Sequence, residues 1–257
     1  MSELAWSDIE VAGALLPAVA YLVVMWHVRH FTGGWPARRG LAFVAAVAAW
    51  AAVTCPAFDA QAQRSLAWHM SQQMTLLLLV PPALVFARPL ELLRRVTGGI
   101  AWHAPGPVIS WIAFVGIQWA LHVPPVLDAI VGRPLADGAM HIALVAAGAM
   151  FFAQAAAPGS RMAHPFALAL YLASAMPTTD AIALLLILDP HVIYSTFAGP
   201  GALADQQTAG VIMFAGGNVM LIAAAVIAGR YLWEGRPAAG VIPGPDVSRP
   251  MRRASSV

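Results

Sequence analysis

Residues 68–87, WHMSQQMTLLLLVPPALVFA, decide the fold of this chain. The stretch is long and apolar enough to cross a membrane, yet its first two turns are polar and contain sulfur. His69 and Gln73 are four residues apart, so they share one face of a helix. Polar groups at one end of a spanning helix are costly unless they bind something or neighbouring helices cover them. The stretch therefore predicts a membrane helix with a polar site at one end.

The composition places the whole chain in the lipid bilayer. Of 257 residues, 60% are apolar and 10% are charged, whereas soluble domains carry about 25% charged residues. All 14 basic residues are Arg, so the absence of Lys excludes a retinal-type Schiff base. Cys55 is alone, which excludes an internal disulfide and a CxxC metal motif. The basic residues form no cluster for nucleic acid, and no nucleophile stands beside a base, so neither a nucleic-acid partner nor an enzyme is predicted.

Hydropathy predicts an all-α polytopic bundle of seven transmembrane helices, formed by one domain at 1–233 and followed by a disordered cytoplasmic tail at 234–257. The predicted spans are Ile9–Val28, Gly40–Cys55, Leu66–Ala87, Val108–Val123, Gly138–Ala156, Pro165–Leu188 and Asp205–Leu232. We expect Pro81 and Pro82 to bend the third span and the segment Pro177–Asp180 to interrupt the sixth. Arg88–Pro107 predicts a short interfacial helix, and the other connections are expected to be loops.

The arginines predict the orientation of the bundle. Twelve of the 14 follow the first, third, fifth and seventh predicted spans, and only Arg64 and Arg133 lie on the opposite side. The positive-inside rule then places the N-terminus outside the cell and the C-terminus in the cytoplasm.

With this orientation, polar groups of several spans collect at the outer end of the bundle. Three of them are imidazoles, one each from the third, fourth and fifth spans: His69, His122 and His141. The expected supporting groups are Gln73, Met70, Asp137, Asp205 and, about 12 Å below the outer end of the sixth span, Asp180. Imidazoles bind copper, zinc, iron or nickel, and thioethers favour Cu(I). The sequence thus predicts an open metal site whose carboxylates and amides orient the imidazoles. The alternative is that these groups only hydrogen-bond the helices to one another.

The order of the motifs resembles a known family. The motifs are His69–Gln73 followed by an apolar run ending in two prolines, Trp102–Pro105 leading into a span, Leu121–Pro125 closing it, His141 opening the next, and Asp205–Met213. Together they are similar to the integral-membrane CtaG type of cytochrome c oxidase assembly factor. The resemblance implies a bacterial plasma-membrane protein that matures a haem–copper oxidase, at the copper-delivery step. The family pattern has histidines where this chain has Gln73 and Asp137, which implies a leaner site.

Three hypotheses follow for the function. The first is a non-enzymatic assembly factor that holds Cu(I) at the outer face and passes it to an oxidase subunit in the membrane. The second is a transporter or channel that uses Asp180 and Asn218, although the inner halves of the third to fifth spans look apolar. The third is a b-type haem protein in which two of the three histidines are axial ligands.

Overall fold

The computed structural model describes residues 16, 18–30, 34–98, 105–156 and 164–234, with side chains to residue 226. Throughout these residues the regular structure is helical. A helix occupies residues 18–30. The labelled elements that follow are α2 (Ala37–Thr54), α3 (Pro56–Ala62), α4 (Leu66–Met74), the π-helix η1 (Thr75–Leu79), α5 (Val80–Ala87), α6 (Pro89–Thr97), α7 (Pro107–His122), α8 (Pro124–Ile130), α9 (Pro134–Ala156), α10 (Pro165–Leu188), the 3₁₀ helix η2 (Ser195–Phe197) and α11 (Ala202–Glu234).

Five helical stretches of the described residues are long and apolar enough to span a membrane. They are α2, the continuous run from α4 to α6, α9, α10 and α11. α7 and α8 together would make a sixth, broken span, because they meet at an angle of 82°. Residues 9–15 and 17 of the first predicted span, Ile9–Val28, lie outside the described residues, as does the predicted tail from residue 235 onward. The prediction of an all-helical multi-pass protein is confirmed, whereas the count of seven and the orientation stay predictions.

The third predicted span has the predicted ends but is not one uniform α-helix. It begins at Leu66 and reaches Ala87, and its middle turn, Thr75–Leu79, is π-helical. The backbone N–H of Val80 bonds to the carbonyl of Thr75, five residues back. Pro81 and Pro82 follow directly and lack the N–H groups that would bond to the carbonyls four residues before them. The irregularity thus falls beside the proline pair that predicted a bend.

The chain then continues into α6 within the segment where a short helix was predicted. Arg88 has a left-handed backbone (φ 53°) at the junction, and its guanidinium pairs with Glu91 at 3.1 Å. Leu92 is buried, whereas Leu90 and Leu93 on the other side of α6 are exposed. α6 is therefore a short helix, as predicted, and its position at a membrane interface stays a prediction.

Three other expectations were wrong. Residues 124–130 form the helix α8 and residues 56–62 form α3, where loops were predicted. In both, proline occupies the first helical turn, where its missing N–H costs nothing. Pro177 also fails to interrupt α10, which is helical from Pro165 to Leu188. Proline is tolerated inside spanning helices because neighbouring helices and side-chain hydroxyls can compensate for the missing N–H.

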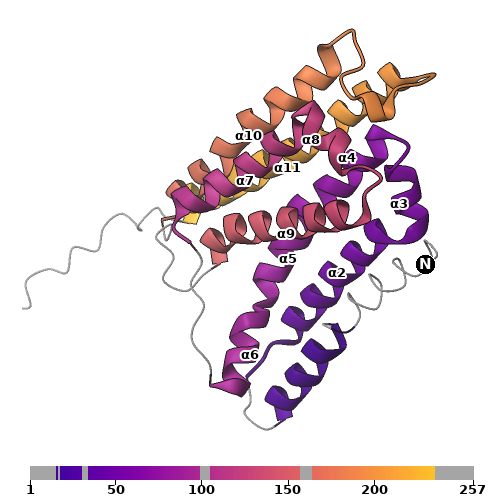
Figure 1. The fold of residues 1–257 in the computed structure, drawn as a ribbon. Coiled ribbons are helices and arrows are strands. Elements are labelled where there is room, and N and C mark those ends of the chain that lie inside the picture. Colours follow the sequence, from indigo (N-terminus) through magenta and orange to yellow (C-terminus); the bar gives the residue numbers. More distant parts are fainter. Residues whose placement is uncertain (1–15, 17, 31–33, 99–104, 157–163, 235–257) are drawn as a thin grey trace, which may run out of the picture.

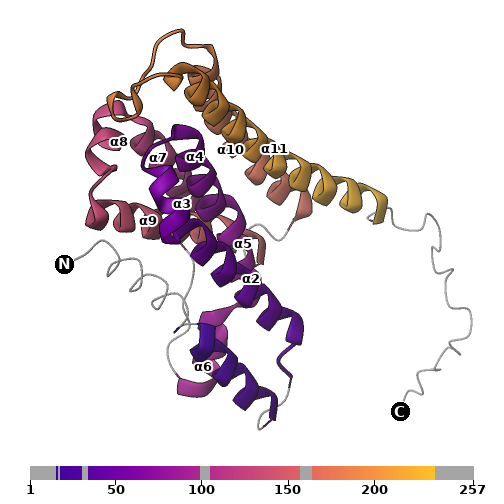
Figure 2. The ribbon, with the colours of Figure 1, turned by 90° about the vertical axis from the view of Figure 1, so that its right-hand side faces the viewer.

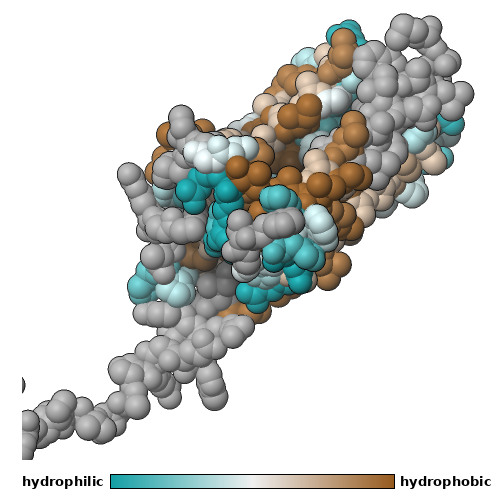
Figure 3. All heavy atoms as spheres, turned by 90° about the horizontal axis from the view of Figure 1, so that it is seen from below, coloured by the Kyte–Doolittle hydropathy of each residue, from teal (hydrophilic) through white to brown (hydrophobic). Residues whose placement is uncertain are grey.

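The helices pack in two groups. α10 and α11 run side by side along their length, while α9 packs against α5 and α7, and α2 against α5 (Figure 1). α4 joins the groups because it packs against α11. The main apolar cluster lies among these helices, and a smaller one joins the helix at 18–30 to α2, α5 and α6. The described surface seen from below carries broad apolar areas along its flank and a gathered polar patch (Figure 3). α8, η2 and the first turns of α4 and α11 lie together at one end of the bundle, away from α6 (Figures 1 and 2).

Candidate functional site

The three predicted histidines are all buried at the end of the bundle that carries α8 and η2. His69 lies in the first turns of α4, His122 is the last residue of α7, and His141 is in the third turn of α9. Their exposed fractions are 0%, 9% and 3%, respectively. Ser65 is the N-cap of α4, since its hydroxyl accepts a hydrogen bond from the backbone N–H of Trp68. Three separate helices therefore bring imidazoles into the protein interior at one end of the bundle, whereas the sequence had predicted an open site there.

Each imidazole has a ring nitrogen without an oxygen or nitrogen hydrogen-bond partner. His69 Nε2 faces the Gln73 amide nitrogen at 2.9 Å; the Ala62 carbonyl interacts with the same ring, but Nδ1 has no partner in hydrogen-bond geometry. His141 Nε2 has none either, and lies 3.7 Å from the carboxylate of Asp137. His122 Nδ1 is 2.7 Å from the carbonyl of Gln118, which leaves Nε2 facing sulfur. Buried nitrogens without partners are uncommon and cost about 1–3 kcal/mol each.

The three rings are neighbours but do not form a ready-made cage. The charge of His69 would interact with the charges of both His141 and His122, which places the rings within electrostatic range. In the described part of the chain, no three His, Cys, Asp or Glu side chains are grouped closely enough to hold a metal ion. Ligation by all three imidazoles would therefore need side chains to move, or donors of another kind.

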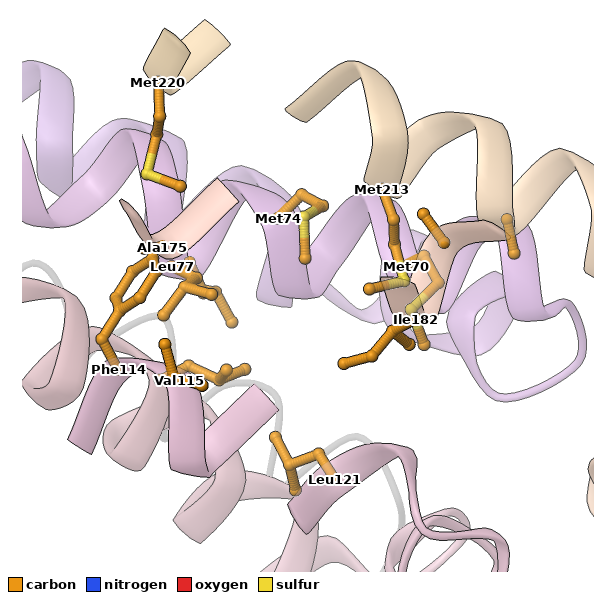
Figure 4. Close-up of a cluster of buried hydrophobic side chains, with 14 of the residues drawn as sticks. Met70, Met74, Leu77, Phe114, Val115, Leu121, Ala175, Ile182, Met213 and Met220 are labelled. Carbon is orange, nitrogen blue, oxygen red and sulfur yellow. The ribbon is translucent and has the colours of Figure 1, made fainter. Parts of the chain in front are cut away.

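Two thioethers lie among the imidazoles. Met70 Sδ is 3.4 Å from His122 Nε2, and Met140 Sδ is 3.4 Å from the amide nitrogen of Gln73. Met70 is fully buried and Met140 is 3% exposed. Met70 and Met74 also belong to the main apolar cluster, together with Met213 and Met220 of α11 (Figure 4). Met70 was predicted as a supporting group, whereas Met140 was not singled out from the sequence.

Asp137 and Asp205 have different roles. Asp137 is buried on α9, one turn before His141, and accepts a hydrogen bond from Gln63 at 3.5 Å. Asp205 accepts from the Ser65 hydroxyl at 2.7 Å and from the backbone N–H of Leu66 at 2.6 Å. A carboxylate at a helix N-terminus is stabilised by the free N–H groups and the helix dipole. Asp205 thus holds the start of α4, the helix that carries His69.

Asp180 was expected beneath the imidazoles and is found at the contact between α10 and α11. A Cβ built on Gly217 would lie 2.8 Å from Asp180 Oδ1, so this carboxylate packs directly on α11. Its neighbour Thr179 makes the link to the site, because its hydroxyl donates to the side-chain oxygen of Gln118 at 3.1 Å. Gln118 is the residue whose carbonyl contacts His122.

Two further contacts position the site and were not predicted. Gln72 donates to the carbonyl of Val53 at 2.7 Å and to Asp59 at 3.3 Å, which ties α4 to the end of α2 and to α3. Gln63 accepts from the backbone N–H of Gly132 at 2.7 Å and connects the α3–α4 turn to the α8–α9 turn. The sequence signal for both was a polar amide at or just before the start of a predicted span, but their partners are distant along the chain.

The segment between α10 and α11 covers the site. The ring centroids of Phe197 and His69 are 5.9 Å apart, and the Tyr194 hydroxyl donates to the carbonyl of His122 at 3.2 Å. Asp128 of α8 fastens this segment, since it accepts from the Ser195 hydroxyl at 2.7 Å and from the Thr196 N–H at 3.1 Å. Gln206 of α11 supports it from the other side through Ile193.

Comparison with protein families gives one result that covers most of the chain. Residues 19–234 match the model of the cytochrome c oxidase caa3 assembly factor family, Caa3_CtaG. The chain belongs to this family. Neither the curated proteins nor the solved structures gave a match. The predicted family is thus confirmed, and with it the general role of an oxidase assembly factor.

The residues that match the Caa3_CtaG family model, 19–234, include all three histidines. The family description concerns assembly of the oxidase and says nothing of copper. Gln73, one of the two departures from the expected histidines, directly contacts His69. The other departure, Asp137, lies against His141. Both positions at which the resemblance implies a histidine therefore lie next to one of the three imidazoles.

Proposed function

We propose that this protein binds Cu(I) as cargo at the extracytoplasmic end of the bundle, through His69, His122 and His141, and passes it to a membrane-embedded subunit of a haem–copper oxidase. It would act in a bacterial plasma membrane, as the oxidase of the family description suggests. The protein would have no catalytic step of its own.

One observation carries this proposal. Three buried imidazoles lie at one end of the bundle on three helices. No protein oxygen or nitrogen hydrogen-bonds to Nε2 of His122 or of His141, and His69 Nε2 meets only the Gln73 amide. In a folded interior such nitrogens are normally paired. Imidazole nitrogens are good donors to copper, and those bound to metal have their second nitrogen held by a carbonyl or carboxylate. His122 already has this arrangement, because its Nδ1 lies against the carbonyl of Gln118.

The surroundings suit temporary binding. The covering segment between α10 and α11 is fastened by side-chain contacts such as Asp128–Ser195 rather than by a long helix. The exposed Gly199 and Gly201 lie in the same segment, and Gly201 has a positive φ of 80°. A cargo site needs both a buried ligand set and a cover that opens, so we assign release of copper to movement of this segment.

The test is made in cells that lack the protein and receive it back in variant form. His69→Ala, His122→Ala and His141→Ala are each expected to lower the copper content and activity of the oxidase, whereas His191→Ala is expected to restore both. His191 is a matched control because it lies at the same end of the bundle with its side chain 87% exposed. Full oxidase copper in all three site variants would contradict the proposal.

A further inference from the structure

Where His122 contacts Met70, a lone pair on the ring nitrogen Nε2 faces a lone pair on the sulfur Sδ. A neutral imidazole has one N–H and one nitrogen with a free lone pair. The carbonyl of Gln118, 2.7 Å from His122 Nδ1, fixes the N–H on Nδ1. Nε2 then presents its lone pair to Met70 Sδ at 3.4 Å, and a thioether sulfur has no hydrogen to donate. Neither atom can satisfy the other without a cation between them.

The spacing of this pair suits two ligands of one metal ion. Metal–nitrogen and metal–sulfur bonds of about 2.0 and 2.3 Å at a tetrahedral angle place the two donor atoms about 3.5 Å apart. Met70 Sδ and His122 Nε2 are separated by 3.4 Å. Both side chains are buried, and they come from α4 and α7, so helix packing holds the spacing.

A second nitrogen–sulfur pair lies nearby, with an amide between its members. The Gln73 amide nitrogen is 2.9 Å from His69 Nε2 and 3.4 Å from Met140 Sδ. This NH₂ group donates to both atoms. Its partly positive hydrogens therefore occupy the place in which a metal cation could be bound by the same nitrogen and sulfur. Each of the two helices supplies one imidazole and one thioether from adjacent residues. His69 and Met70 are adjacent on α4, and Met140 and His141 are adjacent on α9.

We propose that the copper ligands include thioethers, with His122 Nε2 and Met70 Sδ as the primary pair and His69 and Met140 as a second pair that the Gln73 amide occupies until the ion displaces it. This rests on the proposed copper function and replaces a purely imidazole site by a mixed one. Thioethers prefer Cu(I) to zinc and to Cu(II). The mixed set therefore makes the site selective for the cuprous ion, and it supplies the donors that the His, Cys, Asp and Glu side chains do not.

The competing explanation is that these methionines only fill space in an apolar core. Met74, Met213 and Met220 lie in the same cluster. Among the described residues, the methionine sulfur within hydrogen-bond distance of an imidazole nitrogen is that of Met70, at His122. Met74 is the matched control because it is on α4, one turn from Met70, and is similarly buried. Exchanging Met for Leu conserves volume and usually costs less than about 1.5 kcal/mol, so each variant is expected to fold.

The experiment loads the purified full chain with Cu(I) under anaerobic conditions and records X-ray absorption at the copper edge. We expect a sulfur neighbour at about 2.3 Å in the wild type and in Met74→Leu, weakened in Met70→Leu and absent in Met70→Leu/Met140→Leu. Competition with a Cu(I) chelator should show a fall in affinity of about 10- to 100-fold in the double variant, with little change for Zn²⁺.

The outcomes separate this inference from the copper proposal. Nitrogen-only coordination in the wild type, or sulfur scattering that persists in the double variant, overturns the thioether ligands and leaves copper binding by histidine standing. A wild-type protein that takes up no Cu(I) overturns both. The wild-type spectrum decides the matter even when a variant fails to fold.

Discussion

At the scale of single residues, the site depends on which nitrogen of each imidazole is engaged. The Gln118 carbonyl orients His122, and the Gln73 amide occupies His69 Nε2. Gln73 is also a position at which the resemblance set out above implies a histidine, so we expect this chain's copper affinity to be altered most directly there.

We predict that Gln73→His binds Cu(I) more tightly than the wild type, by about tenfold or more, which corresponds to about 1.4 kcal/mol. The new imidazole would add a donor one turn from His69 on the same face of α4. Chelator competition measures the change. Gln72→His is the control, because Gln72 points instead to Val53 and Asp59. Equal or weaker binding by Gln73→His would mean that position 73 does not face the ion.

Asp205 offers a separate prediction about stability. Replacing it with Ala removes two charge-assisted hydrogen bonds at the start of α4, and losing such a cap costs about 0.5–2 kcal/mol. We expect a lower melting temperature in detergent for Asp205→Ala and a smaller loss for Asp205→Asn, which keeps an acceptor oxygen. A melting temperature for Asp205→Ala equal to that of the wild type would show that α4 needs no such cap.

At the scale of elements, η1 depends on a close approach of α9. A Cβ on Gly148 would lie 2.5 Å from Pro81 Cγ and 2.6 Å from the Leu77 carbonyl oxygen. Pro81 leaves that carbonyl without its usual helical partner, so α9 packs against the weakened turn. The π-helical turn η1 and Gly148 therefore pack against each other. This contact lies next to the polar turns of α4.

Gly148→Ala is expected to destabilise the protein by about 1–3 kcal/mol, because either α9 or the backbone at Leu77 must move. Gly116→Ala is the control, since its Cβ would meet nothing within 4 Å. Thermal unfolding of both variants in the same detergent compares them. If Gly148→Ala melts no lower than Gly116→Ala, α9 does not press on the π-turn as described.

The sequence predicted elements well where a span is bounded by strong signals. The span Leu66–Ala87 and helix α10 have the predicted ends, because the apolar runs stop at a polar turn, at Arg88 or at Asp189. α3 and α8 were missed because the proline that opens each helix was interpreted as the end of the preceding span, although proline also begins helices. The π-turn was not predicted, since it depends on the packing of Gly148 against Pro81.

The site was predictable only in part for a similar reason. Histidines near the ends of spans indicated that three imidazoles would meet at one end of the bundle. Met140 and Thr179 gave no such signal, because a methionine or threonine in an apolar helix usually packs in the core or bonds to its own backbone. Their contacts with Gln73 and Gln118 arise from tertiary packing alone.

At the scale of the whole molecule, the bundle is polar at both ends in different ways. The imidazoles, α8 and η2 lie at one end, and the arginines of α6 lie at the other (Figures 1 and 2). By the positive-inside rule we expect the arginine-rich end to face the cytoplasm and the imidazoles to face outward. An outward site is what delivery to the outer side of an oxidase requires.

This orientation predicts the outcome of cysteine labelling in intact cells. In a Cys55→Ala background, His191→Cys should react with a membrane-impermeant maleimide, since its side chain is exposed at the end that carries the imidazoles. Arg94→Cys on α6 is exposed at the opposite end and should react only after permeabilisation. The reverse pattern would place the site in the cytoplasm and contradict delivery at the outer face.

The central claim is tested most directly by the copper content of the purified protein. After anaerobic loading with Cu(I) and removal of loose metal, the wild type and His191→Ala should retain the ion, and the combined variant His69→Ala/His122→Ala/His141→Ala should retain almost none. Equal copper in all three proteins would contradict the claim that the buried imidazoles bind it.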